Sequence, residues 1–456
     1  MPTEPATQKI PSYVQAPYVI DNLGSLGVSR RANGKLNSGY SKYSTSWGID
    51  PFTKPGALGW QEQLTVIDSG HSTITDLIVQ MKARVESGTP YAYSADYAGN
   101  VYKHTLSSDA VSAIITSSGL TLNYGGGLDF FNLSTEKLFI GHDAGVKYFA
   151  FDGTGGTAIT SGVTWVSNVP RPLKAWQNYI YAANDNQLVQ INSSGTVTNA
   201  DILNGSLPQD YHIIDLDNSA DGVYLKILIT RTPAVTLKTT DPTNNAAAID
   251  FQVVYWNGTD EFITAQEFYY SMGASALHTF GQTALIFGQD FLGGLVRDEN
   301  QKIASLPLTT APRPACTDSS GDLALFACLD YMGSKQKLSI FAVGTTDEFT
   351  NKGIWRLHQQ AAQVSTMTDV ATVACFKMVQ NSIYGTSLNA SQPLTNSKFY
   401  VSCYEVKSGG NGYNLYKGTL TPQGTGTPML GVFETETEIF PQSVQFGVAR
   451  VYFEQP

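Results

Sequence analysis

The sequence predicts an all-β protein built as a β-propeller, and three observations support this. Charged residues make up only 14% of the 456 residues, whereas Gly, Tyr and Phe are abundant. This composition suits strands and turns better than surface helices, which are rich in Glu, Lys, Arg and Leu. Alternating strand-turn-strand units recur at roughly 40 to 60 residues, which matches the length of a four-stranded propeller blade. No linker rich in Pro or Ser divides the chain after residue 60, so separate β-sandwich domains are the weaker alternative.

Three hairpin units early in the chain carry this recurrence most clearly. Each joins two alternating apolar strands across a turn that contains Asp, Asn or Gly, as antiparallel hairpins do. The units are PYAYSADYAGNVYKHT (90–105), EKLFIGHDAGVKYFAFDG (136–153) and NYIYAANDNQLVQINSSG (178–195).

Later units are more divergent. A polar insertion, TLKTTDPTNNAAA (236–248), separates two strand patterns, and IWRLHQQAAQ (354–363) fits a short helix or a strand equally well. Unit starts fall near Tyr91, Leu138, Tyr179, Val223, Ala284, Leu323 and Ser382. We therefore predict seven four-stranded blades, with six and eight as the alternatives.

Radial packing of sheets explains why several strand patterns are almost continuously apolar. Blades packed around an axis cover both faces of their inner strands and leave only short edges. The segments KLFIG (137–141), TALIFG (283–288) and LALFA (323–327) then need no polar face.

An extended N-terminal arm, residues 1–57, is expected to lead into a propeller at 58–445, followed by a C-terminal strand or tail at 446–456. In SWGIDPFTKPGAL (46–58), two prolines fix φ and disfavour helix, and two glycines allow bends. The next segment, LGWQEQLTVI (58–67), is expected to help complete a blade.

The arm is basic although the chain is acidic. This excess of basic residues has two interpretations: the segment is a solvated tail, or it is an arm that docks on an acidic neighbour such as another copy of the chain. Its charged residues are Lys9, Arg30, Arg31, Lys35, Lys42 and Lys54 against Glu4, Asp21 and Asp50.

Composition also disfavours several classes of partner and location. A net charge of −10 argues against nucleic-acid binding, which needs Lys and Arg to neutralise phosphates. The N-terminus lacks a basic stretch followed by an apolar one, and no apolar run approaches the roughly 18 residues that span a bilayer. Four cysteines without CxxC or zinc-finger spacing are expected to be buried as small hydrophobic residues, namely Cys316, Cys328, Cys375 and Cys403.

Two acidic segments are candidates for chemistry. DLDNSADG (215–222) places Asp215, Asp217 and Asp221 in a polar loop before a strand, where carboxylates could converge on calcium. The 12-residue calcium loop with its terminal Glu is missing, so an ordinary turn rich in Asp and Asn is the favoured interpretation.

FETETEIF (433–440) alternates three carboxylates, so in a strand they share one face. The favoured interpretation is an exposed strand whose charges discourage edge-to-edge association. The alternative is a contact with a basic partner, such as the Arg30 and Arg31 region of a neighbouring copy. The three residues are Glu434, Glu436 and Glu438.

No pattern in the sequence indicates an enzyme, so we predict no catalytic, cofactor-binding or metal-binding residues. Neither a GxSxG elbow nor a Walker loop is present, and TSGVTW (160–165) lacks the Asp of a sialidase-type turn. The histidines have no metal-binding spacing: His71, His104, His142, His212, His278 and His358. Four aromatic residues could stack on sugars, although packing between blades is favoured for them: Tyr255, Trp256, Tyr269 and Tyr270.

From about Gly27 to Thr105 the chain resembles a family of structural proteins of tailed bacteriophages, the tail or virion β-propellers. The resemblance depends on the order of SRRANGK (29–35), GIDPFTKPGAL (48–58), TDLIVQM (75–81) and YSADYAGNVYKHT (93–105). It implies a non-enzymatic virion component, assembled in the host cytoplasm, in the tail or at an attachment point.

The expected partners are other virion proteins and copies of the chain itself, without nucleic acid or membrane insertion. The alternative function is a receptor- or carbohydrate-binding module of the phage adsorption apparatus, which would contact a host surface glycan or receptor.

Overall fold

The computed structural model describes the following residues: 43–47, 49–50, 59–60, 64–67, 73–116, 119–219, 221–231, 250–259, 264–267, 274–280, 283–288, 291–296, 299–305, 314–320, 323–332, 335–344, 362–368, 370–379, 398–405, 412–419 and 432–435. Within these residues the regular structure consists of strands and one 3-10 helix, η3 (Pro314–Cys316). No helix among them is long and apolar enough to span a membrane.

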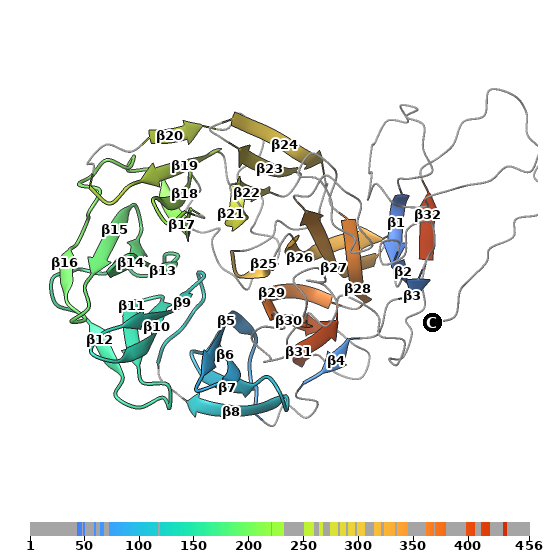
Figure 1. The fold of residues 1–456 in the computed structure, drawn as a ribbon, viewed down its shortest axis with the longest axis horizontal. Helices are drawn as coiled ribbons and strands as arrows, with labels where there is room; N and C mark the ends of the chain where they lie inside the picture. The colour runs from blue at the N-terminus through green and yellow to red at the C-terminus, as the bar shows by residue number, and fades with distance from the viewer. Residues whose placement is uncertain are drawn as a thin grey trace, which may run out of the picture.

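The described strands form seven four-stranded antiparallel sheets arranged around a common centre, as Figure 1 shows. The first four are β5 (Ile78–Glu86), β6 (Thr89–Asp96), β7 (Val101–Thr105) and β8 (Ala110–Ile115); β9 (Gly127–Asn132), β10 (Glu136–His142), β11 (Gly145–Phe149) and β12 (Thr157–Ile159); β13 (Leu173–Trp176), β14 (Tyr179–Asn184), β15 (Gln187–Ile191) and β16 (Val197–Asn199); and β17 (His212–Asn218), β18 (Leu225–Arg231), β19 (Asp250–Trp256) and β20 (Thr264–Glu267).

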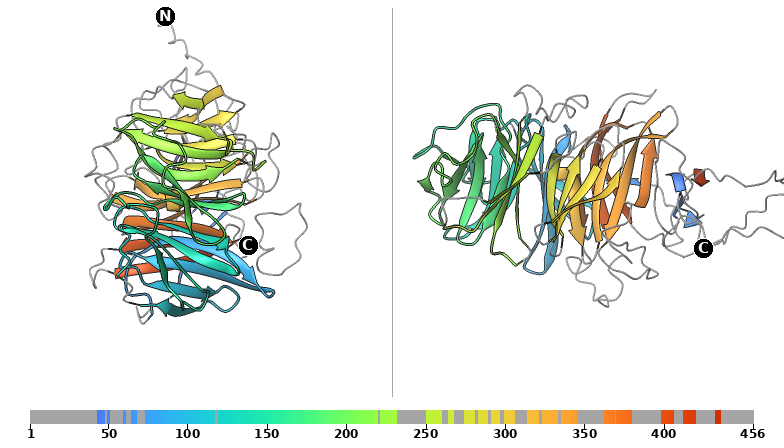
Figure 2. Two further views of the ribbon diagram at one scale, coloured as in Figure 1. Left: turned by 90° about the vertical axis from the view of Figure 1, so that its left-hand side faces the viewer. Right: turned by 90° about the horizontal axis from the view of Figure 1, so that it is seen from above.

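The other three sheets complete the ring. They are β21 (Ala274–Phe280), β22 (Thr283–Gly288), β23 (Phe291–Val296) and β24 (Glu299–Ser305); β25 (Thr317–Ser320), β26 (Leu323–Met332), β27 (Lys335–Gly344) and β28 (Ala362–Thr368); and β29 (Val370–Val379), β30 (Lys398–Glu405), β31 (Gly412–Thr419) and β4 (Thr65–Val66). The side views in Figure 2 show the sheets stacked face against face. The predicted β-propeller is confirmed, and the blade number of the whole chain stays a prediction.

Most of the predicted unit starts mark the second strand of a sheet. Tyr91, Leu138, Tyr179, Ala284 and Leu323 lie in β6, β10, β14, β22 and β26. Val223 lies just before β18, and Ser382 lies outside the described residues, as does 354–361 of the ambiguous IWRLHQQAAQ segment. The last two residues of that segment begin β28.

Burial of both strand faces explains the continuous apolar patterns. In β10, Leu138, Phe139 and Ile140 are each 0% exposed. Leu138 and Ile140 belong to the hydrophobic cluster shared with the β5–β8 sheet, whereas Phe139 belongs to the cluster shared with the β13–β16 sheet. Successive side chains therefore pack against opposite neighbours, because strand side chains alternate between faces. The core is consequently a series of layers between blades.

The hairpin turn of the first sheet requires a glycine. Gly99 has φ +86, and a Cβ at this position would lie 1.5 Å from the carbonyl oxygen of Leu120. Only glycine combines this left-handed conformation with such close backbone approach. Gly99 thereby brings the turn against the segment that leads into the next sheet.

An N-terminal strand closes the ring. β4 pairs with β31, with Val66 opposite Tyr416 and Thr65 opposite Lys417. The adjoining backbone N–H of Ile67 donates to the carbonyl oxygen of Leu415 at 2.9 Å. Because Thr65 and Val66 lie in LGWQEQLTVI, the prediction that this segment helps complete a blade is confirmed.

Two short sheets involve the region predicted to be an arm. β1 (Tyr43–Trp47) pairs with β32 (Val432–Thr435), and β2 (Ile49–Asp50) pairs with β3 (Gly59–Trp60). The β2–β3 pair thus flanks the segment with two prolines, Pro51 and Pro55. Residues 1–42 and 446–456 lie outside the described residues, so the domain boundaries stay predictions.

Candidate functional site

Charged side chains gather on the innermost strands of neighbouring sheets. We call this set the inner belt and define it as Lys82 on β5, Asp129 on β9, Lys174 on β13, and Asp215 and Asp217 on β17. These strands lie nearest the centre of the ring in Figure 1. The belt is the candidate functional site because it concentrates buried charge where several blades meet.

The first half of the belt joins three consecutive sheets. Lys82 Nζ donates to Asp129 Oδ1 across the junction between β5 and β9. The other carboxylate oxygen of Asp129 accepts the backbone N–H of Ala175 on β13 at 2.9 Å. One carboxylate therefore bridges a side chain of the preceding blade and the backbone of the following one.

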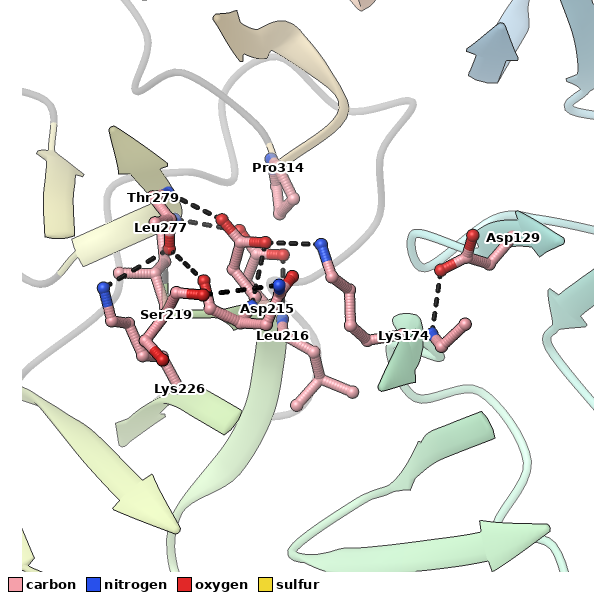
Figure 3. A network of polar contacts seen from close by, with 12 residues as sticks. Asp129, Lys174, Asp215, Leu216, Ser219, Lys226, Leu277, Thr279 and Pro314 are labelled. Atoms are coloured by element: carbon pink, nitrogen blue, oxygen red, sulfur yellow. Dashed lines mark hydrogen bonds and ion pairs between the residues drawn. The ribbon is translucent and has the colours of Figure 1, made fainter. Parts of the chain in front are cut away.

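The second half repeats this arrangement two blades further along. Lys174 Nζ on β13 donates to Asp217 Oδ1 on β17 at 2.5 Å. Asp217 Oδ2 then accepts the backbone N–H of Thr279 on β21 at 2.6 Å. Figure 3 shows Lys174 extending from its strand toward the β17 carboxylates, with Asp129 on its other side.

Asp215 differs from the rest of the belt, because backbone N–H groups hold its carboxylate and, among the described residues, no lysine or arginine forms an ion pair with it. Its Oδ2 accepts the backbone N–H of Leu277 at 2.8 Å, and its Oδ1 accepts that of Leu216 at 2.9 Å. Burial raises the pKa of Asp215 to about 8, the N–H of Leu277 opposes this, and the charge of Asp217 adds to it.

In Asp217 and Lys174, neighbouring charges and hydrogen bonds outweigh the effect of burial on the pKa. Burial is the largest single effect on the pKa of Asp217 and raises it. The positive charges of Lys174 and His278, with the hydrogen bonds from Lys174 and Thr279, together outweigh burial and hold that pKa well below its usual range. Burial is also the largest single effect on the pKa of Lys174 and lowers it, but the negative charges of the three belt aspartates and the hydrogen bond to Asp217 together outweigh it, so the pKa of Lys174 is raised. The two groups are a charged pair at neutral pH.

These shifts predict that Asp215 makes the fold less stable as pH rises. Its folded pKa of about 8 exceeds the reference value of 3.8, so the folded state binds the proton more tightly between these values. The stability that the protonated Asp215 gives the folded state is fully present below about pH 4, and it is lost progressively as the pH rises to about 8. Asp215→Asn should therefore raise the unfolding temperature relative to the native chain at pH 8.5 more than at pH 5. An equal difference at both pH values would show that Asp215 ionises normally.

The structure corrects the predicted position of two aspartates. Asp215 and Asp217 do not lie in a loop: they lie in β17 and are buried. The segment alternates Asp with apolar residues, so one face packs in the core and the other carries the carboxylates to the next blade. Only Asp221 lies in a turn, where it accepts from Ser219 Oγ and from the N–H of Val223.

A second polar set secures the turns that follow the second strands. Asp143 accepts from the backbone N–H of Asn123 at 3.1 Å and of Tyr124 at 3.2 Å, in the segment that leads into β9. Asn184 accepts from the N–H of Val166 at 2.8 Å, in the segment that leads into β13. Each of these side chains therefore fixes the connection between two blades.

Arg171 is the central residue of this second set. It is 0% exposed, and its guanidinium donates to the carbonyl oxygen of Ala183 at 2.9 Å and to Asn184 Oδ1 at 2.8 Å. It also donates to the carbonyl oxygen of Val166 and lies 4.7 Å from the ring centre of Trp165. Burial lowers the pKa of Arg171 to about 10, so it stays charged at neutral pH.

The remaining sequence candidates are dispersed. Among the described residues, no three His, Cys, Asp or Glu side chains converge to hold a metal ion. His104 is buried against Ser94 Oγ, and His212 pairs with Asp185. His71 and His358 lie outside the described residues.

The predicted burial of cysteines and aromatic residues is confirmed where side chains are described. Cys316 and Cys403 are 1% and 0% exposed. Trp256 is 2% exposed and packs against Trp176 and Tyr181, and Tyr255 is partly buried. Tyr269 and Tyr270 lie outside the described residues.

Only part of the predicted glutamate strand is described. Glu434 lies in β32 opposite Thr45, whereas Glu436 and Glu438 lie outside the described residues.

Three members of the belt were not expected from the sequence: Lys82, Asp129 and Lys174. Asp129 and Lys174 are the single charged residues of their strands, whereas Lys82 shares β5 with Arg84 and Glu86, and each partner lies more than 40 positions away. A search for charged residues at matching positions of the first strands could have found them. In the structure, Lys82, Asp129 and Lys174 all pair with an aromatic residue of the second strand: Tyr93, Phe139 and Tyr181.

No protein-family model matches the sequence, and a search of curated proteins gives no match. Among solved structures, the chain is similar to the β-propeller domain of Cps50 (Swd1) from Myceliophteria thermophila, with a TM-score of 0.46 at 10% identity over 78% of this chain and 99% of that one. The structure of U3-55K gives the same four values. The computationally designed Ika8 protein gives a TM-score of 0.43 at 9% identity over 79% and 99%. These similarities concern the fold alone.

Proposed function

We propose that this chain is a non-enzymatic structural component of a tailed-phage virion, in the tail or its attachment apparatus. It assembles through its propeller surface and its N-terminal arm. The inner belt is the observation that supports a structural role. Its lysines pair with aspartates of the next blade, and all three aspartates accept backbone N–H groups of the following one. The charged groups thus serve to fix blades against one another.

The phage assignment is supported by the resemblance between about Gly27 and Thr105. Within this stretch, YSADYAGNVYKHT forms the hairpin of β6 and β7. Asp96, in its turn, accepts from the N–H of Asn100 at 2.7 Å and from the hydroxyl of Tyr102 at 2.7 Å. This places the last motif of the resemblance in the first sheet of the ring, immediately after the closing strand β4.

Deleting residues 1–42 should separate folding from assembly. The deletion ends before β1 and keeps β4, so the ring should fold and unfold at about the temperature of the full chain. We expect it to be missing from purified particles, because the proposed arm has been removed. The measurement is quantitative immunodetection in particles made with the truncated chain as the only copy. Normal incorporation of the folded truncation would contradict the role of the arm.

A further inference from the structure

The ring closes at the junction between the last sheet and the first, which lie side by side in Figure 1. The last sheet combines β29, β30 and β31 with β4, which comes from the N-terminal part of the chain. β4 consists of two residues, Thr65 and Val66, which pair with Lys417 and Tyr416 of β31. Because β4 leads directly into the first sheet, this short pairing and the packing across the junction hold the seven sheets in a closed ring.

A histidine is buried in this junction. His104 lies on β7 and is 2% exposed. Its cross-strand partners are Ala92 on β6 and Val111 on β8, and both belong to a hydrophobic cluster that includes Tyr400 and Leu415 of the last sheet. Residues that pair directly across strands share a face of the sheet. The imidazole is therefore enclosed between the first sheet and the last.

The surroundings of His104 suit a neutral imidazole. Its Nε2 lies 2.6 Å from Oγ of Ser94, which is itself 0% exposed. Its Nδ1 is buried and has no hydrogen-bond partner among the described residues. In the neutral ring one nitrogen carries no hydrogen, so Nε2 can donate to Ser94 while Nδ1 stays bare. A proton on Nδ1 would become a buried donor without an acceptor, which destabilises the closed junction.

No carboxylate in the described part of the chain pairs with this ring. Asp109, in the turn after β7, pairs with Lys417 across the same junction, and Asp96 accepts from the hydroxyl of Tyr102 at 2.7 Å. The members of the cluster on β5 and β8 are apolar. Burial therefore lowers the pKa of His104 to about 4 without a neighbouring charge to oppose it.

We infer that His104 is a pH-sensitive switch of ring closure: its protonation opens the junction between the last sheet and the first, and β4 separates from β31. In the open state the imidazole is solvated and regains the ordinary pKa of about 6.5. The closed state is then fully favoured above about pH 6.5 and loses stability as the pH falls to about 4. The inference concerns the ring itself and does not rest on the virion role.

The junction between β17 and β21 responds to acid in the opposite direction. Burial raises the pKa of Asp215 to about 8, so protonation of its carboxyl group stabilises the folded state as the pH falls. The backbone N–H of Leu277, which donates to this carboxyl group, lies on β21. Selective opening at the closure can therefore be distinguished from general unfolding by comparing β31 with β21.

Hydrogen exchange of the full-length chain at pH 7.5 and pH 5 tests the inference. Mass spectrometry of peptides gives protection factors, which correct for the pH dependence of the intrinsic exchange rate. We expect protection of β4 and β31 to fall roughly 25-fold between the two pH values, from the two pKa values of the switch. Protection of β21 should not fall. Equal losses in both places, or no loss in β4 and β31, would overturn the inference.

A pair of variants assigns the response to one histidine. His104→Gln keeps a side chain that can bond to Ser94 but does not titrate, so β4 and β31 should be equally protected at both pH values. The matched control is His142→Gln, because burial and the charge of Arg171 also lower the pKa of His142 to about 4, at a turn of the second sheet. It should keep the acid response of β31. An acid response that persists in His104→Gln would contradict the assignment. If His104→Gln does not fold, the comparison of β31 with β21 in the native chain decides.

Discussion

Replacing Arg171 by alanine is expected to lower the free energy of unfolding by about 4 kcal/mol. The substitution leaves the carbonyl oxygens of Val166 and Ala183 buried without their donor, and it removes the packing against Trp165. It also opens a cavity, because the side chain is fully buried. Chemical denaturation at pH 7, followed by tryptophan fluorescence, measures the change.

Two further variants separate packing from hydrogen bonding at this position. Arg171→Met keeps most of the buried volume but supplies no donor, so it should recover only a small part of the loss. Arg171→Lys supplies one ammonium group in place of the planar guanidinium fork, and should fall between Met and the native residue. Equal stability of the Met variant and the native chain would show that the hydrogen bonds contribute nothing.

Replacing Asp217 by alanine is expected to lower the free energy of unfolding by about 3 kcal/mol, because it leaves Lys174 charged and largely buried without its ion-pair partner. The backbone N–H of Thr279 also loses its acceptor, so the contact between β17 and β21 weakens. Asp217→Asn should cost less, since the amide oxygen can still accept from that N–H. Denaturant titration of each variant at pH 7 gives the values.

A double replacement tests whether the pair acts as a unit. In the combined variant with Lys174→Met and Asp217→Leu, no charge is left without a partner, so stability should exceed that of Asp217→Ala. The variants Lys174→Met and Asp217→Leu are also measured singly. If the loss in free energy of unfolding of the combined variant equals the sum of these two single losses, the two residues act independently and the belt does not couple blades.

Hairpins were the part of this fold that could be predicted. In EKLFIGHDAGVKYFAFDG, the strands β10 and β11 lie close in sequence and are joined by a short turn, so composition and alternation identify them together. The first and fourth strands of each sheet are harder to predict from the sequence than the two strands of the central hairpin. β12, for example, is three residues long, and β4 consists of two residues that pair across the whole chain with β31. The pairing of β4 with β31 depends on closure of the ring, which the local sequence does not specify.

The inner belt could not be predicted from the alternation of residues along the strands. IIDLD in β17 alternates in the manner of a strand, yet its aspartates look like turn residues because charged groups are rarely buried without partners. Their partners, Lys174, Leu277 and Thr279, belong to adjoining blades and lie 43 to 62 positions away. Such contacts depend on how the sheets pack, which local pattern does not specify.

The structure shows which strands the segment SWGIDPFTKPGAL, with its two prolines and two glycines, connects. Its first residues end β1, Ile49 and Asp50 form β2, and the chain returns to pair as β3 at Gly59 and Trp60. A few residues later, β4 completes the last sheet. The segment therefore connects β1, which pairs with β32, to the region of β4, the strand that closes the ring.

An image reconstruction of intact particles tests the central proposal most directly. We expect a ring of blades among the tail or attachment proteins of the particle. Particles that are complete and infectious without any such ring would contradict a virion role for this chain.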